Sequence, residues 1–284
     1  MKFSLWKEAL LSAVLVLLLL SPGISLAGES TETLPWEKFG ANFGVFVSSL
    51  DSSFRIGSGL GLDIDVEELL DLDTTNTVFR AGALWRFTDN RRHRLDFTWF
   101  AFRRDGTRQL TEDITIEKDD GTTVTLNAGS TVDAFFDMDI YQLAYSYSFF
   151  QDDRVDLAAG IGLYVMPLDF GIQAAGLVDK EGSASFTAPL PVLGLRMDFA
   201  LTPKWFIRTG SQVFYLEYDN FRGSILEFHG ALEYKPWKHV GIGLGFDALD
   251  VKVEAEDEDY PAIDFRGDVQ FNYTGLQLYL RYFY

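Results

Sequence analysis

Residues 77–101, TVFRAGALWRFTDNRRHRLDFTWFA, decide the fold class of this chain. On each side of a short polar break, apolar residues occupy every second position: Phe79, Ala81, Ala83, Trp85 and Phe87 before it, and Leu95, Phe97, Trp99 and Ala101 after it. Such a period of two is typical of strands with one apolar and one polar face. The stretch therefore predicts two neighbouring antiparallel strands joined by a short turn.

The same alternation recurs along the rest of the chain. It predicts about ten strands, within a range of roughly eight to twelve. We expect them at residues 39–50, 77–87, 94–104, 136–149, 155–166, 190–201, 205–216, 224–235, 239–249 and 269–284. The expected fold class is therefore all-β.

The connections between these strands alternate in length. Those near 88–93, 150–154, 202–204 and 236–238 are short, whereas those near 51–76, 105–135, 167–189 and 250–268 are long and 217–223 is intermediate. Short turns on one side and long loops on the other are typical of an antiparallel up-and-down β-barrel that crosses a bacterial outer membrane. We expect the short turns and both termini on the periplasmic side, and the longer loops outside the cell.

Aromatic residues gather near the short turns: Phe87, Phe149, Trp205, Tyr234, Trp237, Tyr282 and Tyr284. A belt of rings at that level suits a membrane interface, where one end of each side chain meets hydrocarbon and the other meets water. The alternative is the core of a soluble β-sandwich. The opposite faces of the same strands carry charges, which favours the barrel.

The N-terminus carries the three parts of a secretory signal. Lys2 and Lys7 precede an apolar run at 9–20, and Ser25-Leu26-Ala27 offers small residues for cleavage. The run of about a dozen residues is short for a membrane anchor, which needs roughly 20. We therefore expect a signal peptide at 1–27, an N-terminal periplasmic segment at 28–38 and the barrel domain at 39–284.

Composition limits the chemistry and the partners of the chain. It contains no cysteine, so neither disulfides nor thiol chemistry are available. The formal net charge is −18, and it becomes about −19 once the two lysines and one glutamate of residues 1–27 are removed. An acidic chain repels phosphate backbones, so we expect no nucleic-acid partner.

The end of the chain resembles the C-terminal strand signal of bacterial outer-membrane β-barrel proteins. Leu278, Leu280, Tyr282 and Tyr284 lie on alternate positions, and the last residue is aromatic. The resemblance implies that Leu280, Tyr282 and Tyr284 form the signal read by the barrel-insertion machinery, with Tyr284 where Phe is more common. It also implies a Gram-negative outer-membrane location after cleavage near Ala27, in contact with lipid and lipopolysaccharide. Barrels of this shape include structural proteins, narrow channels, lipid-modifying enzymes and surface proteases.

The polar faces of the strands carry charges of both signs. The residues expected to point into the lumen are Arg80, Arg86, Arg94, Arg104, Arg196, Arg208, Lys235 and Arg281, against Asp96, Asp156, Asp198, Glu227, Glu233 and Asp247. The turn lengths predict three cross-strand ion pairs: Arg86 with Asp96, Arg208 with Asp198, and Arg208 with Glu233. A buried charge needs a partner, because desolvation costs several kcal/mol per ion. We therefore expect a narrow lumen filled by paired charges and ordered water.

Two glycine runs also face the expected lumen: Gly160 and Gly162, and Gly241, Gly243 and Gly245. A bare wall leaves space either for a solute or for a large side chain to lie flat against it. We favour the second interpretation, with Tyr279, Arg281 or His229 as the side chain.

His229 is the strongest catalytic candidate. It is expected to face inward beside Glu227, with Asp247 opposite Glu227 on the next strand. A histidine with two carboxylates can activate water or a hydroxyl group. The pattern is weak, since no serine or second acidic pair completes it, and an ordinary polar cluster explains it as well.

The acidic loops match no defined calcium-binding pattern, so we expect neither a metal nor a cofactor. The sequence therefore predicts a non-enzymatic outer-membrane barrel with a structural, surface-interaction or narrow transport role. The alternative is a barrel enzyme that acts on lipopolysaccharide or surface peptides through His229 and its acidic neighbours.

Overall fold

The computed structural model describes residues 35–56, 64–65, 75–111, 113–117, 123–174, 183–218, 221–255 and 267–284. The expected signal peptide at 1–27, its cleavage site and residues 28–34 lie outside the described residues. Within the described ranges, no helix is long and apolar enough to cross a membrane.

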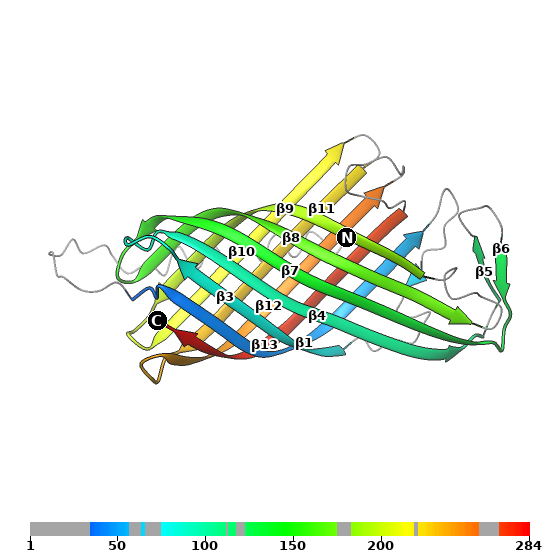
Figure 1. Cartoon of the computed structure of the whole chain (residues 1–284), viewed down its shortest axis with the longest axis horizontal. Helices are drawn as coiled ribbons and strands as arrows, with labels where there is room; N and C mark the ends of the chain where they lie inside the picture. Colours follow the sequence, from blue (N-terminus) through cyan, green and yellow to red (C-terminus); the bar gives the residue numbers. More distant parts are fainter. Residues whose placement is uncertain are drawn as a thin grey trace. The chain divides into compact units, whose positions relative to one another are not determined.

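Ten long antiparallel strands form a closed barrel (Figure 1). In chain order they are β1 (Phe39–Ile56), β3 (Thr75–Arg86), β4 (His93–Gln109), β7 (Thr131–Gln151), β8 (Val155–Ala174), β9 (Ser183–Ala200), β10 (Trp205–Tyr218), β11 (Phe221–Tyr234), β12 (Val240–Ala255) and β13 (Gly267–Phe283). Each pairs with the next of these strands, and β13 pairs with β1 to close the ring. The expected all-β, up-and-down barrel of about ten strands is thus confirmed.

Three short strands lie outside this ring. β2 (Ile64–Asp65) pairs with the far end of β1, and β5 (Ile114–Glu117) pairs with β6 (Thr123–Leu126). The β5–β6 hairpin lies beyond the ends of β4 and β7 (Figure 1). We call this end of the barrel the loop end. The opposite end, which holds the short connections 87–92, 152–154, 201–204 and 235–239 and the C-terminal residue, is the turn end.

An apolar band surrounds the outside of the barrel next to the turn end. On β1 it comprises Phe39, Ala41, Phe43, Val45 and Val47, and comparable runs occupy the outward positions of the other strands. It covers about nine residues of each strand, or roughly 23 Å at a rise of about 3.3 Å per residue and a tilt near 40°. Nearer the loop end the outward residues become polar, as at Arg103, Asp137 and Asp169.

The interior changes in the opposite sense. Next to the turn end it holds charged side chains, whereas next to the loop end it is a mainly apolar core, in which the inward Arg104 lies over the Phe136 ring. The rings of that core pack edge to face, tilted or stacked, with centroids 5.3–6.3 Å apart: Phe46, Phe100, Phe102, Phe136, Phe271 and Tyr273. The lumen is therefore filled by charged side chains in its turn-end half and mainly by apolar side chains in its loop-end half.

Two seams between strands end early on the way to the loop end. The β3–β4 ladder stops at Arg80 and Phe100, and the β9–β10 ladder stops at Leu193 and Val213, although all four strands continue. Beyond these points the described pairings form two sheets that face each other across the apolar core.

Most strands extend past their expected bounds, and most of the extra residues lie at the loop end. β8 ends at Ala174 rather than near 166, and β9 begins at Ser183 rather than near 190. The reason is the change of phase: where the outward side chains become polar, the inward ones become apolar, and the expected pattern of apolar outward positions breaks although the strand continues.

Candidate functional site

Nine charged side chains form a cluster inside the barrel next to the turn end. This ionic cluster comprises Glu37, Arg86, Asp156, Arg196, Asp198, Arg208, Glu233, Lys235 and Arg281, all buried. Six strands or their ends contribute to it, because alternate positions of each strand point inward. Arg94 and the half-buried Asp96 border it.

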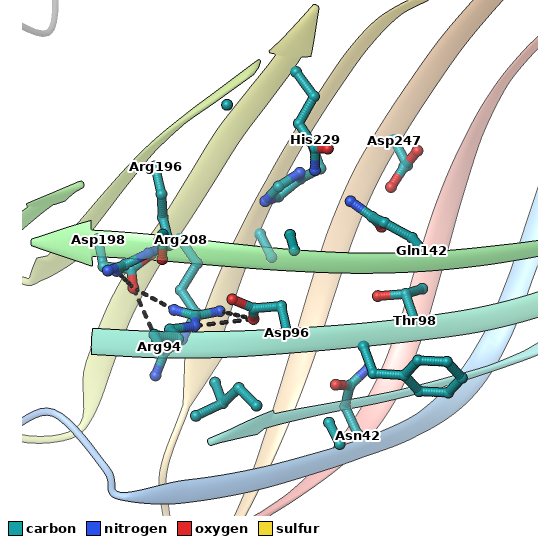
Figure 2. A pocket seen from close by; sticks show the side chains of 18 of the residues that line it. Asn42, Arg94, Asp96, Thr98, Gln142, Arg196, Asp198, Arg208, His229 and Asp247 are labelled. Carbon is teal, nitrogen blue, oxygen red and sulfur yellow. Dashed lines mark hydrogen bonds and ion pairs between the residues drawn. The ribbon is translucent and has the colours of Figure 1, made fainter. Parts of the chain in front are cut away.

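Asp198 is one centre of the ionic cluster. Its Oδ2 atom accepts from Arg196 at 2.6 Å, from Arg94 at 3.1 Å and from Arg208 at 3.3 Å, and Arg86 lies 3.7 Å away. Figure 2 shows Arg94 and Arg208 converging on this carboxylate from different strands. Neighbouring Asp156 accepts from Arg86 and Arg196, each at 2.9 Å. The arginines therefore share two carboxylates rather than forming isolated pairs.

Glu233 is the second centre. It accepts from Arg208 Nε at 2.6 Å, from Arg281 at 2.8 Å and from the Tyr279 hydroxyl at 2.8 Å. Both arginines also donate to Glu37, Arg208 at 2.7 Å. Arg208 thus joins the two centres, because it contacts Asp198, Glu233 and Glu37 at once.

Residues 35–38 dock into the turn-end mouth of the barrel. Trp36 is 0% exposed; its Nε1 atom donates to the Asp152 carbonyl at 2.7 Å, and its ring packs edge-on against Phe206. The Glu37 carbonyl accepts from Arg86 at 3.1 Å. The sequence predicts an N-terminal periplasmic segment at 28–38, before the barrel domain. Within it, Trp36 and Glu37 are buried in the turn-end mouth by the cluster's cations and an apolar pocket.

The charges around residues 35–38 shift two pKa values outside the strands. Burial alone would raise the pKa of Glu37, but Arg208, Arg281 and Lys235 together hold it well below its usual range. Burial lowers the pKa of Lys235 to about 8, although Glu37 opposes the shift. The Lys235 ammonium lies 3.3 Å from Glu37 and 3.7 Å from the centre of the Phe206 ring. Glu37 is therefore a fixed anion at neutral pH.

The expected pair of Arg86 with Asp96 is wrong. Arg86 lies opposite Arg94, and Asp96 lies opposite Leu84, because Phe87 bonds to His93 and shifts the register by two residues. The two arginines are tolerated side by side because Asp156 and Asp198 lie between them and neighbouring strands. Asp96 contacts Arg94 instead.

Arg208 lies directly opposite Asp198, the register that the turn length implies. It lies opposite Ala231 rather than Glu233, and reaches Glu233 diagonally. Long arginine side chains thus reach carboxylates that the register alone would not place opposite them.

A cavity of about 160 Å³ lies between the ionic cluster and the apolar core. Uncharged polar side chains line much of it: Asn42, Thr98, Gln142, Ser146, Gln212 and Gln277. Figure 2 shows Asn42, Thr98, Gln142 and His229 at one side and the Arg94–Asp198 group at the other. The side-chain amide oxygen of Gln212 and the Ser146 hydroxyl are buried and have no hydrogen-bond partner among the described residues. Such a polar cavity has room for several ordered waters that would bond to these atoms.

His229 lies beside this cavity. Its Nδ1 atom is 2.7 Å from Glu227, and its ring covers Gly210, where a Cβ atom would lie 2.4 Å from the imidazole. Asp247 lies opposite His229, so the expected placement of Asp247 opposite Glu227 is wrong. Glu227 faces Leu249.

Asp247 has other partners in place. It accepts from Arg80 at 2.7 Å and from the Tyr273 hydroxyl at 2.8 Å. The three catalytic candidates therefore come close together, but inside the barrel wall and bound to structural neighbours rather than at an open rim. Among the described residues, no group of three histidine, aspartate or glutamate side chains is placed to hold a metal.

The glycines on the inner face accommodate large side chains. A Cβ atom on Gly243 would lie 2.1 Å from the Tyr279 ring, and one on Gly245 would lie 2.6 Å from Gln277. Tyr279 thus lies flat against β12 while its hydroxyl reaches Glu233. This packing supports the interpretation that the glycines of β12 leave room for a large side chain to lie flat against the strand.

Glu37 is the functional residue that the sequence did not reveal. It falls before the first expected strand, where no alternation marks it as inward. The charges of the expected lumen residues supply a signal: eight cations face six carboxylates, so further anions from outside the expected strands are required.

The sequence has no match among protein-family models. It has none among curated proteins either. Among solved structures, the outer membrane protease OmpT from Escherichia coli shares 10% identity over 90% of this chain and 100% of its own, with a TM-score of 0.53. The transport unit of the autotransporter AIDA-I from Escherichia coli shares 8% identity over 92% and 93%, with a TM-score of 0.40.

The attachment invasion locus protein Ail of Yersinia pestis shares 10% identity over 84% of this chain and 98% of its own, with a TM-score of 0.29. The likeness to OmpT establishes the fold alone. In fold, the chain is similar to the small bacterial outer-membrane β-barrels.

Proposed function

We propose that this chain is a non-enzymatic barrel of the Gram-negative outer membrane that does not conduct ions and presents its loop end as a surface for interaction. The observation that carries the proposal is the filled lumen. The ionic cluster with Glu37 closes the turn end, and the aromatic side chains of Phe46, Phe100 and Phe102 fill the loop-end half. Both layers narrow the route that water and ions would take along the lumen, which supports a barrel that does not conduct.

The outer surface supports the membrane location. The apolar band of roughly 23 Å is close to the height of about 25 Å expected for an outer-membrane barrel. The rings of Trp205 and Tyr234 pack in a tilted arrangement beside the turn end, with centroids 4.6 Å apart, where an aromatic belt belongs. Leu280 and Tyr282 of β13 and the terminal Tyr284, the residues of the expected insertion signal, are exposed on the outside of the barrel.

The length of the strands supports the surface role. β7 has 21 residues, which span about 50 Å along the barrel axis at the usual rise and tilt, about twice the apolar band. The part beyond the band carries polar outward residues, so it would stand in water above the membrane. Its apolar core makes it a rigid support for the loops.

Two measurements test the proposal on the full-length protein. Cell fractionation should place the mature protein in the outer membrane, with heat-modifiable migration on gels, whereas recovery with soluble periplasmic proteins would contradict it. Purified protein in planar bilayers should give no steady conductance. A large, stable single-channel current would refute the filled lumen and restore the channel interpretation.

The enzyme alternative gains little from the site. His229 contacts Glu227 in mid-barrel, and Asp247 is held by Arg80 and Tyr273. A base of this kind needs a site that a substrate can reach, and the cavity beside His229, whose side chain is 35% exposed, lies between the ionic cluster and the apolar core rather than at the loop-end rim. We therefore assign His229 and its neighbours a structural role within the proposal.

A further inference from the structure

The seam between β9 and β10 differs from the rest of the barrel wall. Its ladder ends at Leu193 and Val213, yet β9 continues for ten residues toward the loop end, paired with β8, and β10 continues for five, paired with β11. The two strands thus separate while each remains part of a sheet.

Proline explains why the ladder ends there. Pro189 and Pro191 of β9 lie at outward positions just beyond the last pair, opposite Val165 and Leu163 of β8. Proline has no backbone N–H, so it is confined to positions whose N–H would face away from a ladder. Since β9 stays paired with β8 through both prolines, the missing donors are on the β10 side. The sequence itself therefore prevents the seam from closing.

The side chains behind the seam are apolar and accessible. Phe214 and Leu216 share the inward face of β10 with Arg208 and Gln212, because they lie on the same alternate positions. Phe214 is half-buried and Leu216 is 45% exposed. On the β9 side the facing residues are Leu190 and Val192, both buried. An inward apolar residue with this exposure indicates an opening in the wall.

The second interrupted seam, between β3 and β4, provides a contrast. There the inward residues Val78 and Phe102 are 8% and 0% exposed, and the Asn76 side chain donates to the Arg103 carbonyl across the seam. An interrupted ladder therefore does not by itself expose the interior. The exposure at Leu216 is particular to the β9–β10 seam.

The position of the seam identifies what would enter it. Leu193 and Val213, the last paired residues, are 65% and 50% exposed and belong to the apolar band, and Tyr215 follows outward on β10. The opening therefore begins at the loop-end margin of the band. Unpaired backbone groups are excluded from hydrocarbon itself but are tolerated at its polar margin.

We propose that the β9–β10 seam is a lateral opening that binds one acyl chain of an outer-leaflet lipid against Phe214 and Leu216. A saturated chain is narrow and apolar, it would come from the adjoining margin of the apolar band, and it would cover the inward side chains that water otherwise contacts. The inference rests on the membrane location proposed above and adds a ligand to it.

A photo-crosslinking experiment tests the inference. The full-length protein is reconstituted in phosphatidylcholine vesicles that contain a palmitic acid analogue with a diazirine in its chain, and the labelled residues are mapped by peptide mass spectrometry. Outward residues such as Leu193 and Val213 should be labelled in any membrane-inserted barrel. Phe214 and Leu216 should also be labelled, whereas Val78 and Phe102, the inward residues at the other seam, should not.

A double variant, Pro189→Val with Pro191→Val, sharpens the test. It restores two backbone donors, so labelling of Leu216 should fall by roughly tenfold, as expected when two net hydrogen bonds close the seam, while Leu193 stays labelled. Heat-modifiable migration checks that the variant is folded. If the variant does not fold, the labelling pattern of the unmodified protein decides the test. Labelling confined to outward residues would overturn the opening but leave the membrane location standing. No labelling at Leu193 or Val213 would overturn both.

Discussion

Along β12, the turn-end and loop-end halves of the barrel carry their apolar side chains on opposite faces. Ile242, Leu244 and Phe246 point outward, whereas Leu249, Val251 and Val253 point inward and are at most 3% exposed. The change falls near Asp247. The outward face of the same strand thus suits apolar surroundings in the turn-end half and polar surroundings in the loop-end half. The comparison teaches that the medium outside decides which face of a strand is apolar.

The two halves are also held together by different forces. In the turn-end half the interior is stabilised by shared ion pairs, where each desolvated charge requires partners within hydrogen-bond distance. In the loop-end half the interior is stabilised by burial of rings and aliphatic side chains, at roughly 25 cal/mol per Å² of apolar surface. Removal of one charged partner in the turn-end half should therefore lower the stability strongly. In the loop-end half the loss of stability should scale with the apolar surface removed.

The largest expected effect concerns closure of the turn-end half. Deletion of Tyr282–Tyr284 removes two outward rings and the end of β13, where Tyr284 exchanges backbone hydrogen bonds with Phe39. We expect little or no assembled protein in the outer membrane, measured by fractionation and heat-modifiable migration. Tyr284→Phe, which keeps an aromatic end, should assemble normally. Normal membrane levels of the truncated protein would contradict the insertion signal.

The next effect compares one interior with the other. Arg208→Ala leaves Asp198, Glu233 and Glu37 without their shared cation, so it should lower the free energy of unfolding by roughly 3–5 kcal/mol. Ile140→Val, in the loop-end core, should cost only about 1 kcal/mol. Both are measured by urea unfolding of the protein refolded in phosphatidylcholine vesicles. Equal losses in the two variants would mean that the halves do not differ as described.

The smallest effect concerns the docked segment and acid. Because the cations hold the pKa of Glu37 well below its usual value of about 4.3, its contribution is complete above that value and is lost as the pH falls through the lowered pKa. A spin label at Lys38→Cys should therefore stay immobile from pH 8 to 5 and become mobile only below about pH 4. The chain has no other cysteine, so the label is specific.

Glu37→Gln supplies the control for this measurement. With a neutral amide at position 37, the mobility of the label should no longer change with pH through this carboxyl group. A transition between pH 5 and 7 in the unmodified protein would mean that another group holds the segment.

The sequence predicts the barrel because the outward positions of the turn-end half are apolar on most strands, as at Phe79 to Phe87 and Leu276 to Tyr282. It predicts Asp198 opposite Arg208 because the short turn at 201–204 leaves little freedom of register. It misplaces Asp96 because a turn only two residues tighter moves every partner on the strand. It misses Glu37 since docking of an irregular segment leaves no periodic trace.

The loop-end core was hidden for a different reason. Phe100 and Phe102, or Leu249 and Val251, alternate as regularly as the outward residues do, but in the opposite phase. When the alternation of outward apolar residues is followed along the strand, these inward residues break it, and the strand is predicted to end there. A search for phase inversion along a strand, rather than for loss of alternation, would find both halves.

The contacts of Glu37 also bear on the order in which the barrel forms. Glu37 meets Arg208 and Arg281, which follow it by 171 and 244 positions in the chain. Contacts of such sequence separation are reached late in folding, because the intervening chain must first be ordered. Arg281 reaches Glu37 only after β13 has paired with β1, so the set of cations around Glu37 is complete only in the closed ring. A barrel arrested one strand short would leave Glu37 with Arg208 and Lys235 but without Arg281.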